Sequence, residues 1–182
     1  MRRVNVDVAS HFQRKNMNYF ELFELEVIFN IDKNLLLDKY IELQKKYNPD
    51  KAESEVELYK RTSIASEVNA AYKTLKNDYL RASYILKLKG IDIHQDEGRN
   101  YKMPSFLLAS MLDKQEKLSS VEGEVALNLY RERELLERSE IVLKIDGNIK
   151  EGKIEHAIIN TMLLKYHDNL LNIINQKIEK CS

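Results

Sequence analysis

The residues of clearest chemical interest lie in a short turn, Tyr47-Asn48-Pro49-Asp50-Lys51, between two amphipathic segments. Pro49 disfavours helical geometry at Asn48, so the preceding helix is expected to end there. Asp50 is then presented at the tip of the turn, where a carboxylate can reach a basic partner residue, ideally an arginine that binds it bidentately. The simpler interpretation is that Pro-Asp only forms a turn, which is ordinary chemistry for this pair.

The four histidines and the single cysteine form no catalytic or metal-binding pattern. His11 and His94 fall in an expected tail and linker, while His156 and His167 lie about three helical turns apart in one segment. Cys181 excludes a disulfide or a cysteine-based metal site within one chain, and a reducing compartment is the simplest setting. We therefore expect no catalytic residue, no metal and no cofactor, and a protein that is not an enzyme.

The composition indicates a helical protein without a nucleic-acid or membrane role. Of 182 residues 43% are apolar, which suffices for a core, and only 5 are Gly and 2 are Pro. The 29 basic and 29 acidic residues cancel, so nothing draws the chain to phosphate backbones. No apolar run approaches the roughly 20 residues of a membrane span.

Around the turn, the pattern predicts a short helix, a helical hairpin and a fourth helix that ends near Gly90. The expected N-caps are Asn18, Asp32, Ser54, and Asn77 or Asp78, with Glu21 and Glu57 completing capping boxes. Apolar residues at i, i+4, i+7 and i+11 mark the two arms of the hairpin: Leu36, Tyr40, Leu43 and Tyr47, then Ile64, Val68, Ala71 and Leu75.

The second half predicts three helices with short joins, and so an antiparallel three-helix bundle. Pro104 is expected at a first helical position, Ser119 with Glu122 as the cap of a long helix to about Ile145, and residues 146–148 as a turn. The expected core stripe of the last helix is Ile159, Leu163, Tyr166, Leu170 and Ile173. No strand pattern is found.

These patterns divide the chain into four parts: a disordered tail (1–16), a helical domain (17–90), a linker (91–103) and the bundle (104–182). The tail could result from a start codon placed too early, because Met17 directly precedes the first expected helix. The alternative for this segment is a weak organellar presequence.

Several segments resemble one family. The turn is similar to the His-Pro-Asp turn of J-domains, with Asn48 in place of histidine. Residues 19–23 (Tyr-Phe-Glu-Leu-Phe) and 68–75 resemble J-domain helices, and 81–86 (Arg-Ala-Ser-Tyr-Ile-Leu) resembles the segment that leaves the J-domain in HscB, the co-chaperone of iron–sulfur cluster assembly. Residues 106–108 resemble the start of the HscB scaffold-binding bundle.

The resemblance implies an all-α fold, with an N-terminal J-domain helical hairpin followed by the C-terminal antiparallel three-helix bundle. It also implies two partners: an HscA-type chaperone, whose ATPase the J-domain would stimulate, and an IscU-type scaffold protein, held by the bundle. Linking the two would raise the local concentration of scaffold at the chaperone. We expect a monomer in a bacterial cytoplasm, with the mitochondrial matrix as a minor alternative.

The chaperone-binding residues implied are Asn48, Pro49, Asp50, Lys39, Lys45, Lys46 and Lys51. The lysines could instead form a solvated helix face, in which Glu42 pairs with Lys46. Asparagine cannot be protonated but still offers a donor and an acceptor, so ATPase stimulation is expected to be weak or tuned to its own chaperone.

The scaffold-binding residues implied are Phe106, Leu107, Leu108, Met111, Leu112, Asp113, Glu116 and Tyr166. Leu108 and Leu112 widen the apolar arc of their helix to roughly 140°, which suits either a partner surface or two internal neighbours. Tyr166 could face the scaffold or be buried in the core stripe of its helix. Two further alternatives are a J-like adaptor that binds a client without stimulating the chaperone, and a helical regulator unrelated to chaperones.

Overall fold

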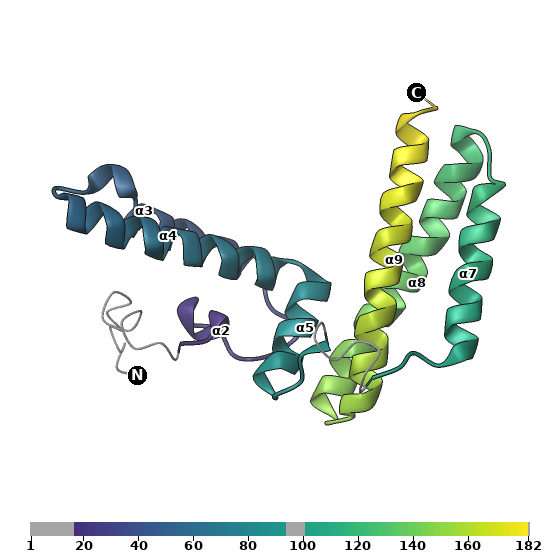
Figure 1. The fold of residues 1–182 in the computed structure, drawn as a ribbon, viewed down its shortest axis with the longest axis horizontal. Coiled ribbons are helices and arrows are strands. Elements are labelled where there is room, and N and C mark those ends of the chain that lie inside the picture. The colour runs from purple at the N-terminus through teal and green to yellow at the C-terminus, as the bar shows by residue number, and fades with distance from the viewer. Residues whose placement is uncertain (1–16, 94–100, 182) are drawn as a thin grey trace. The chain divides into compact units, whose positions relative to one another are not determined.

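The structure, a computed structural model, describes residues 17–93 and 101–181 (Figure 1). Within these ranges the chain forms helices and no strand, which confirms the all-α prediction. No helix there is long and apolar enough to cross a membrane. The chain divides into two compact units, Met1–Arg81 (unit 1) and Ala82–Ser182 (unit 2). The expected tail, 1–16, and the central part of the expected linker, with His11 and His94, lie outside the described residues, so the predicted domain limits stay predictions.

Unit 1 begins with the short helix α2 (Tyr19–Leu22), whose predicted capping box is present. The Asn18 side chain accepts hydrogen bonds from the backbone N–H groups of Phe20 and Glu21, and the Glu21 carboxylate accepts one from the Asn18 N–H at 2.9 Å. Phe20 and Phe23 are fully buried, so this single turn contributes a large part of the core of unit 1.

The hairpin consists of α3 (Lys33–Lys46) and α4 (Glu55–Lys76). Asp32 caps α3 as predicted, and Ser54 caps α4, although the Glu57 carboxylate accepts from the Glu53 N–H rather than from the N-cap. The two arms meet along the predicted stripes, where the buried members are Leu36, Tyr47, Ile64, Val68, Ala71 and Leu75.

Helix α5 (Asp78–Leu88) begins in unit 1 and is anchored there by a buried arginine. Arg81, only 3% exposed, donates to the carbonyl oxygens of Phe29 at 2.7 Å and Leu75 at 2.5 Å and to the Asp78 carboxylate at 2.7 Å. Asn77 accepts from the Leu80 N–H, which confirms one of the two predicted caps. Burial works to raise the pKa of Asp78, but hydrogen bonds from Lys33 and Arg81 outweigh it, and the net pKa is lowered.

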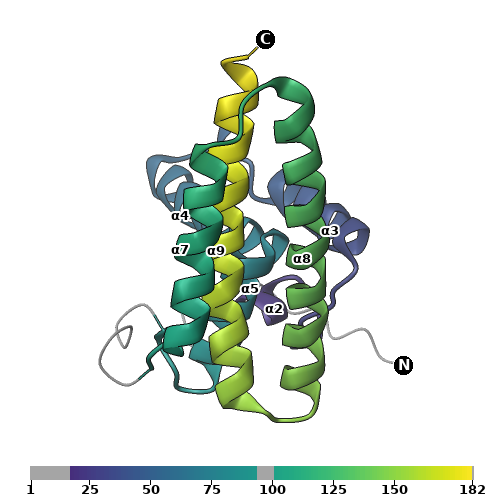
Figure 2. The same cartoon turned by 90° about the vertical axis from the view of Figure 1, so that its right-hand side faces the viewer.

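Unit 2 is the predicted antiparallel three-helix bundle of α7 (Ser105–Ser119), α8 (Glu124–Lys150) and α9 (Ile154–Glu179) (Figure 2). Pro104 lies at the N-cap of α7 rather than inside it. One cluster of the core contains Leu118, Leu127, Leu170, Leu171 and Ile174, and so joins all three helices.

Two further sequence-based expectations for unit 2 are wrong. Ser119 does not cap α8; its hydroxyl donates to the Glu116 carbonyl at the end of α7, and α8 follows Gly123, whose φ of +81° breaks the chain direction. Residues 146–148 are no turn, because α8 runs through them and turns only near Gly152. A lone Gly costs a helix only about 1 kcal/mol, and here an Asp146–Lys150 pair spans it.

The predicted core stripe of α9 is also displaced. Of its members only Leu170 is buried, and Tyr166 is half-buried. The residues that α9 buries are Ala157, Ile158, Thr161, Leu164, His167, Leu170, Leu171 and Ile174. Apolar spacing alone does not identify this face, because the residues that meet the bundle include the polar Thr161 and His167.

Candidate protein-binding surfaces

The turn between α3 and α4 is a single 3-10 helix, Pro49–Lys51, with Asn48 at its N-cap. The Asn48 side-chain oxygen accepts from the Asp50 N–H at 2.9 Å, and the Asn48 carbonyl accepts from the Lys51 N–H at 3.2 Å. Asp50 is exposed. Asn48 therefore forms the turn with its own amide and leaves the Asp50 carboxylate open to a partner.

The four predicted lysines differ in how they are held. Lys39 pairs with Glu24 at 2.5 Å, and the Lys46 ammonium lies 5.3 Å from the centre of the Tyr47 ring. Lys45 and Lys51 are exposed, and within the described ranges neither forms an ion pair. The alternative pairing of Glu42 with Lys46 is not formed in that part of the chain.

The eight predicted scaffold-binding residues separate into buried and exposed groups. Met111 is only 7% exposed and faces the bundle, and the half-buried Tyr166 donates its hydroxyl hydrogen to the Met111 carbonyl. Leu107, four residues before Met111 on the same side of α7, is half-buried. The exposed members are Phe106, Leu108, Leu112, Asp113 and Glu116.

The exposed members lie on two sides of α7. Leu108, Leu112 and Glu116 follow one another at intervals of four residues and form one line, which we call the α7 stripe. Phe106 lies about 160° around the helix from Leu108, on the side of Asp113, whose carboxylate pairs with Lys117 at 2.6 Å. A single small surface of a partner cannot contact both sides at once.

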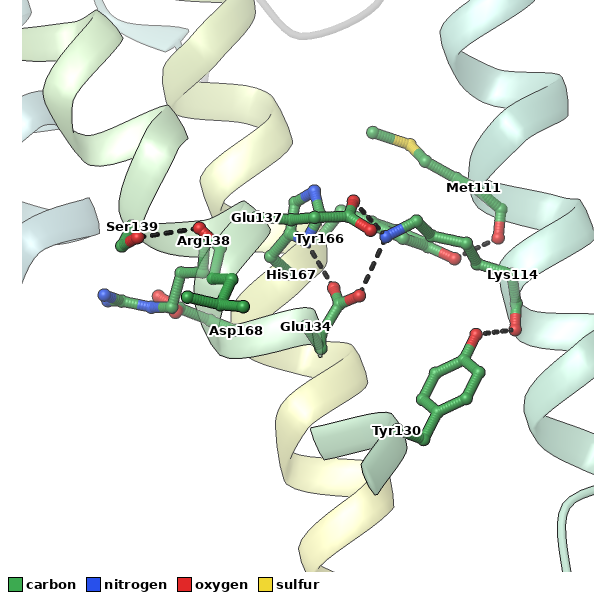
Figure 3. A network of polar contacts seen from close by, with 11 residues as sticks. Met111, Lys114, Tyr130, Glu134, Glu137, Arg138, Ser139, Tyr166, His167 and Asp168 are labelled. Atoms are coloured by element: carbon green, nitrogen blue, oxygen red, sulfur yellow. Dashed lines mark hydrogen bonds and ion pairs between the residues drawn. The ribbon is translucent and has the colours of Figure 1, made fainter. Parts of the chain in front are cut away.

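A polar network connects side chains from the three helices of the bundle (Figure 3). Glu134 on α8, 2% exposed, accepts from Lys114 on α7 at 2.8 Å and contacts His167 on α9, which is 5% exposed. Lys114 also pairs with Glu137. Tyr130 reinforces this junction by donating to the Lys114 carbonyl at 2.9 Å. The polar network, Lys114, Glu134, Glu137 and His167, therefore ties all three helices together.

The electrostatics of the polar network depend on mutual pairing. Burial works to raise the pKa of Glu134, but hydrogen bonds from His167 and Lys114 outweigh it, and the pKa is lowered. For Lys114, burial works to lower the pKa, and the bonds to Glu134 and Glu137 raise it overall. The ligand atoms of Glu134, Glu137 and His167 lie within 4.8 Å of one another, a spacing that suits a metal ion. The Lys114 ammonium already bonds to both carboxylates, so the protein supplies the balancing cation itself.

The polar network was not predicted, although the sequence of α8 carries one signal of it. Glu134 lies seven residues after Leu127 and seven before Ile141, both of which are buried on α8. An acidic residue in register with a core line indicates a buried carboxylate that needs a cation nearby. The sequence gives no comparable signal for His167, because the apolar residues around it fit a different buried face of α9.

Comparison with known proteins assigns the family. No model of a known protein family matches the sequence. The HscB homolog of Aliivibrio salmonicida, a co-chaperone, is 34% identical over 169 residues, which cover 90% of this chain and 96% of the relative. The HscB homolog of Psychromonas ingrahamii is 45% identical over 97 residues, or 52% of this chain and 57% of that one.

The solved structure of the chaperone HscB from Vibrio cholerae matches with a TM-score of 0.81 and 27% identity over 91% of this chain and all of that one. A hairpin of this form followed by a three-helix bundle defines a J-domain co-chaperone. The chain belongs to the HscB family of co-chaperones. The family assignment removes the alternative of a helical regulator unrelated to chaperones, and the relatives are co-chaperones rather than enzymes.

Proposed function

We propose that this protein carries an IscU-type iron–sulfur scaffold protein to an HscA-type chaperone and stimulates the ATPase of that chaperone, in a bacterial cytoplasm. The carrying observation is the exposed Asp50 at the tip of a hairpin whose turn Asn48 closes with its own side chain. Family membership supports the two kinds of partner.

The chaperone contact in this proposal combines one directed charge with a weaker basic surround. Asp50 accepts a bidentate hydrogen bond from an arginine of the chaperone, and bonds of this kind contribute about 1.5–3 kcal/mol. Lys45 and Lys51 are exposed beside the turn and act mainly on the rate of association with an acidic surface. Pro49 fixes the backbone between them.

Single-turnover ATP hydrolysis by the chaperone of the same organism tests this contact. Asp50→Asn removes the charge and keeps the shape of the side chain. It should therefore raise the concentration of this protein needed for half-maximal stimulation by about 10- to 100-fold. Glu53→Gln is the matched control, because Glu53 is also exposed and lies three residues further on. Equal stimulation by both variants would remove Asp50 from the contact.

The second candidate function is an adaptor that binds a client but does not stimulate the chaperone, and Asn48 is the observation that favours it. An asparagine has no ring and cannot be protonated, so any role that the family histidine plays beyond closing the turn is lost. The same assay compares the wild type with Asn48→His. Stimulation by the wild type supports the first proposal; no stimulation, with recovery in Asn48→His, supports the adaptor.

For the scaffold contact we propose the α7 stripe, Leu108, Leu112 and Glu116. Leu112 is 67% exposed, and Leu108 is 48% exposed, so both can be buried by a partner without rearrangement of the bundle. Met111 and Tyr166 hold α7 against α9 through their hydrogen bond, and they contribute less contact area to the partner. Phe106 and Asp113 would contact only a partner that also reaches the other side of α7.

Calorimetric titration with the scaffold protein tests the α7 stripe. The double variant Leu108→Ala and Leu112→Ala should weaken binding by about 100-fold, because each truncation of a well-packed contact costs on the order of 1–2 kcal/mol. Leu143→Ala is the control, since Leu143 is 71% exposed on α8 instead. Phe106→Ala should change binding by less than the double variant. No binding of the scaffold by the wild type would overturn this part of the proposal.

A further inference from the structure

The face of α8 that points away from the bundle is apolar. Val125, Leu129, Leu136 and Leu143, here called the α8 stripe, are 86%, 57%, 66% and 71% exposed. By helical geometry Leu136 lies about 160° around α8 from the buried line of Leu127, Glu134 and Ile141. These are therefore the most outward positions of the helix, where polar residues are expected.

The regular spacing sets the α8 stripe apart from scattered surface leucines, which are common. Its members follow at intervals of four, seven and seven residues, so they stay on one side for about 27 Å of helix. An apolar line of this length on a long, straight helix is the pattern with which one helix packs along another. Within the described ranges, α7 and α9 pack on the opposite side of α8, where its buried residues lie.

The three leucines of the α8 stripe are symmetric about Leu136, whereas Val125 has Gly147 at its mirrored position. Leu136 has one leucine seven residues before it and another seven residues after it, so two antiparallel copies centred on Leu136 bring Leu129 of each against Leu143 of the other. A surface that matches its own reverse suits a twofold interface, in which each copy presents the same patch.

The charges beside the α8 stripe repeat this symmetry. Arg133 and Glu140 are exposed, lie about 20° apart around the helix on one flank, and stand three residues before and four residues after Leu136. In the antiparallel arrangement each Arg133 therefore meets Glu140 of the other copy. In a parallel arrangement Glu140 would face Ser139 and have no cation. Arg133 would meet Glu132, which already pairs with Arg131 of its own chain at 3.8 Å, so the charges favour the antiparallel pair.

We propose that two copies of this protein associate through the α8 stripe as an antiparallel pair, with Leu136 at the twofold axis and Arg133 paired with Glu140 across it. Four apolar side chains per copy cover less than the roughly 800 Å² per partner of a stable interface, so the dimer is weak and forms only at high protein concentration. The expectation of a monomer then holds for dilute protein. The proposal does not depend on scaffold binding, since the α8 stripe and the α7 stripe lie on different helices and share no residue.

Sedimentation velocity of the full chain over a concentration range of roughly 5 to 500 µM tests the proposal. The wild type should shift from monomer to dimer within that range. Leu136→Glu should raise the dissociation constant by about 100-fold or more, because both copies lose a buried leucine and gain a charge at the axis. Leu112→Glu, at 67% exposure against 66% for Leu136, is the matched control and should leave the shift unchanged.

A charge exchange distinguishes this pair from other modes of self-association. Arg133→Glu alone should weaken the dimer about tenfold, and Arg133→Glu with Glu140→Arg should restore it, since only the antiparallel pair joins these two positions. Circular dichroism checks that all variants keep their helices. A wild type that stays monomeric throughout, a dimer indifferent to Leu136→Glu, or a failure of the double exchange to restore association would each overturn the proposal.

Discussion

The turn in unit 1 and the polar network in unit 2 each centre on one carboxylate, in opposite surroundings. Asp50 is exposed and its turn is held by a single side-chain hydrogen bond from its own backbone to Asn48. Glu134 is 2% exposed and is bonded to Lys114 and His167, which come from two other helices. The first carboxylate is available to another molecule, and the second is fully used inside the fold.

This difference separates function from stability along the chain. An exposed charge contributes little to folding because water already solvates it, so evolution can place it for a partner at small cost. A buried charge is tolerated only when its partners are present, and removing one of them leaves the others unpaired. Changes at the turn should therefore alter activity in a folded protein, while changes in the polar network should alter the fold first.

The largest expected effect is at Glu134. Glu134→Ala leaves Lys114 and His167 without their buried partner, so the free energy of unfolding should fall by about 3–5 kcal/mol. Glu137→Ala removes the other carboxylate bound to Lys114, but Glu137 is 51% exposed, and the loss should stay below about 1 kcal/mol. Urea unfolding measures both. Similar losses would show that burial does not distinguish the two carboxylates.

A second test asks whether unit 1 has a buried anchor of its own, away from the turn. Arg81→Ala removes the donor to the Phe29 and Leu75 carbonyls, while Asp78 keeps Lys33 at 3.0 Å, so the loss should be about 2–4 kcal/mol. Arg61→Ala is the control; Arg61 is half-buried, and it bonds to Glu57 and the Lys46 carbonyl.

Hydrogen exchange locates the effect of the arginine change. Arg81→Ala should speed amide exchange in α3 and α4, and Glu134→Ala should speed it in α7, α8 and α9. If Arg81→Ala left exchange in the hairpin unchanged, Arg81 would not be the anchor that its three hydrogen bonds indicate.

The contrast also explains which parts of the structure the sequence could predict. The capping of α2 by Asn18 and of α3 by Asp32 was predictable because a cap depends on residues within one turn of helix. The hairpin was predictable because its buried lines are apolar throughout. The sequence predicted an end of α8 near Ile145, five residues too early, because the Asp146–Lys150 pair is a weak signal beside an Asp-Gly-Asn sequence.

The polar network could not be derived in the same way. Its members lie on three helices, and whether they meet depends on how each helix is rotated about its own axis. For α9, the apolar spacing predicted a buried face displaced by about one residue. The turn was located from Pro49 and Asp50 alone, but its partner contact stays a prediction. On α7, the sequence could not tell which apolar residues face the core; the structure shows that Met111 is buried and Leu112 is exposed.

Acid should remove the contribution of Glu134 to the stability of the bundle. The pKa of Glu134 is lowered in the folded state, so its contribution to stability is present above the ordinary glutamate pKa of about 4.3 and is lost as the pH falls through the folded value. The difference in unfolding free energy between the wild type and Glu134→Gln should therefore be largest near neutral pH and narrow toward pH ~3. Urea unfolding at a series of pH values measures it, and a constant difference would mean that Glu134 is not ionised in the fold.

The smallest effect on stability is expected at the turn. Asn48→Ala removes the acceptor for the Asp50 N–H and should cost about 0.5–1 kcal/mol, the usual contribution of an N-cap. Asp50→Asn should change the unfolding free energy by less than about 0.5 kcal/mol, since the side chain is exposed. Both variants should nevertheless weaken chaperone stimulation, the first because the turn loosens and the second because the charge is gone. A loss of stability at Asp50 as large as that at Glu134 would erase the distinction, because the exposed carboxylate would then be part of the fold rather than a group held ready for a partner.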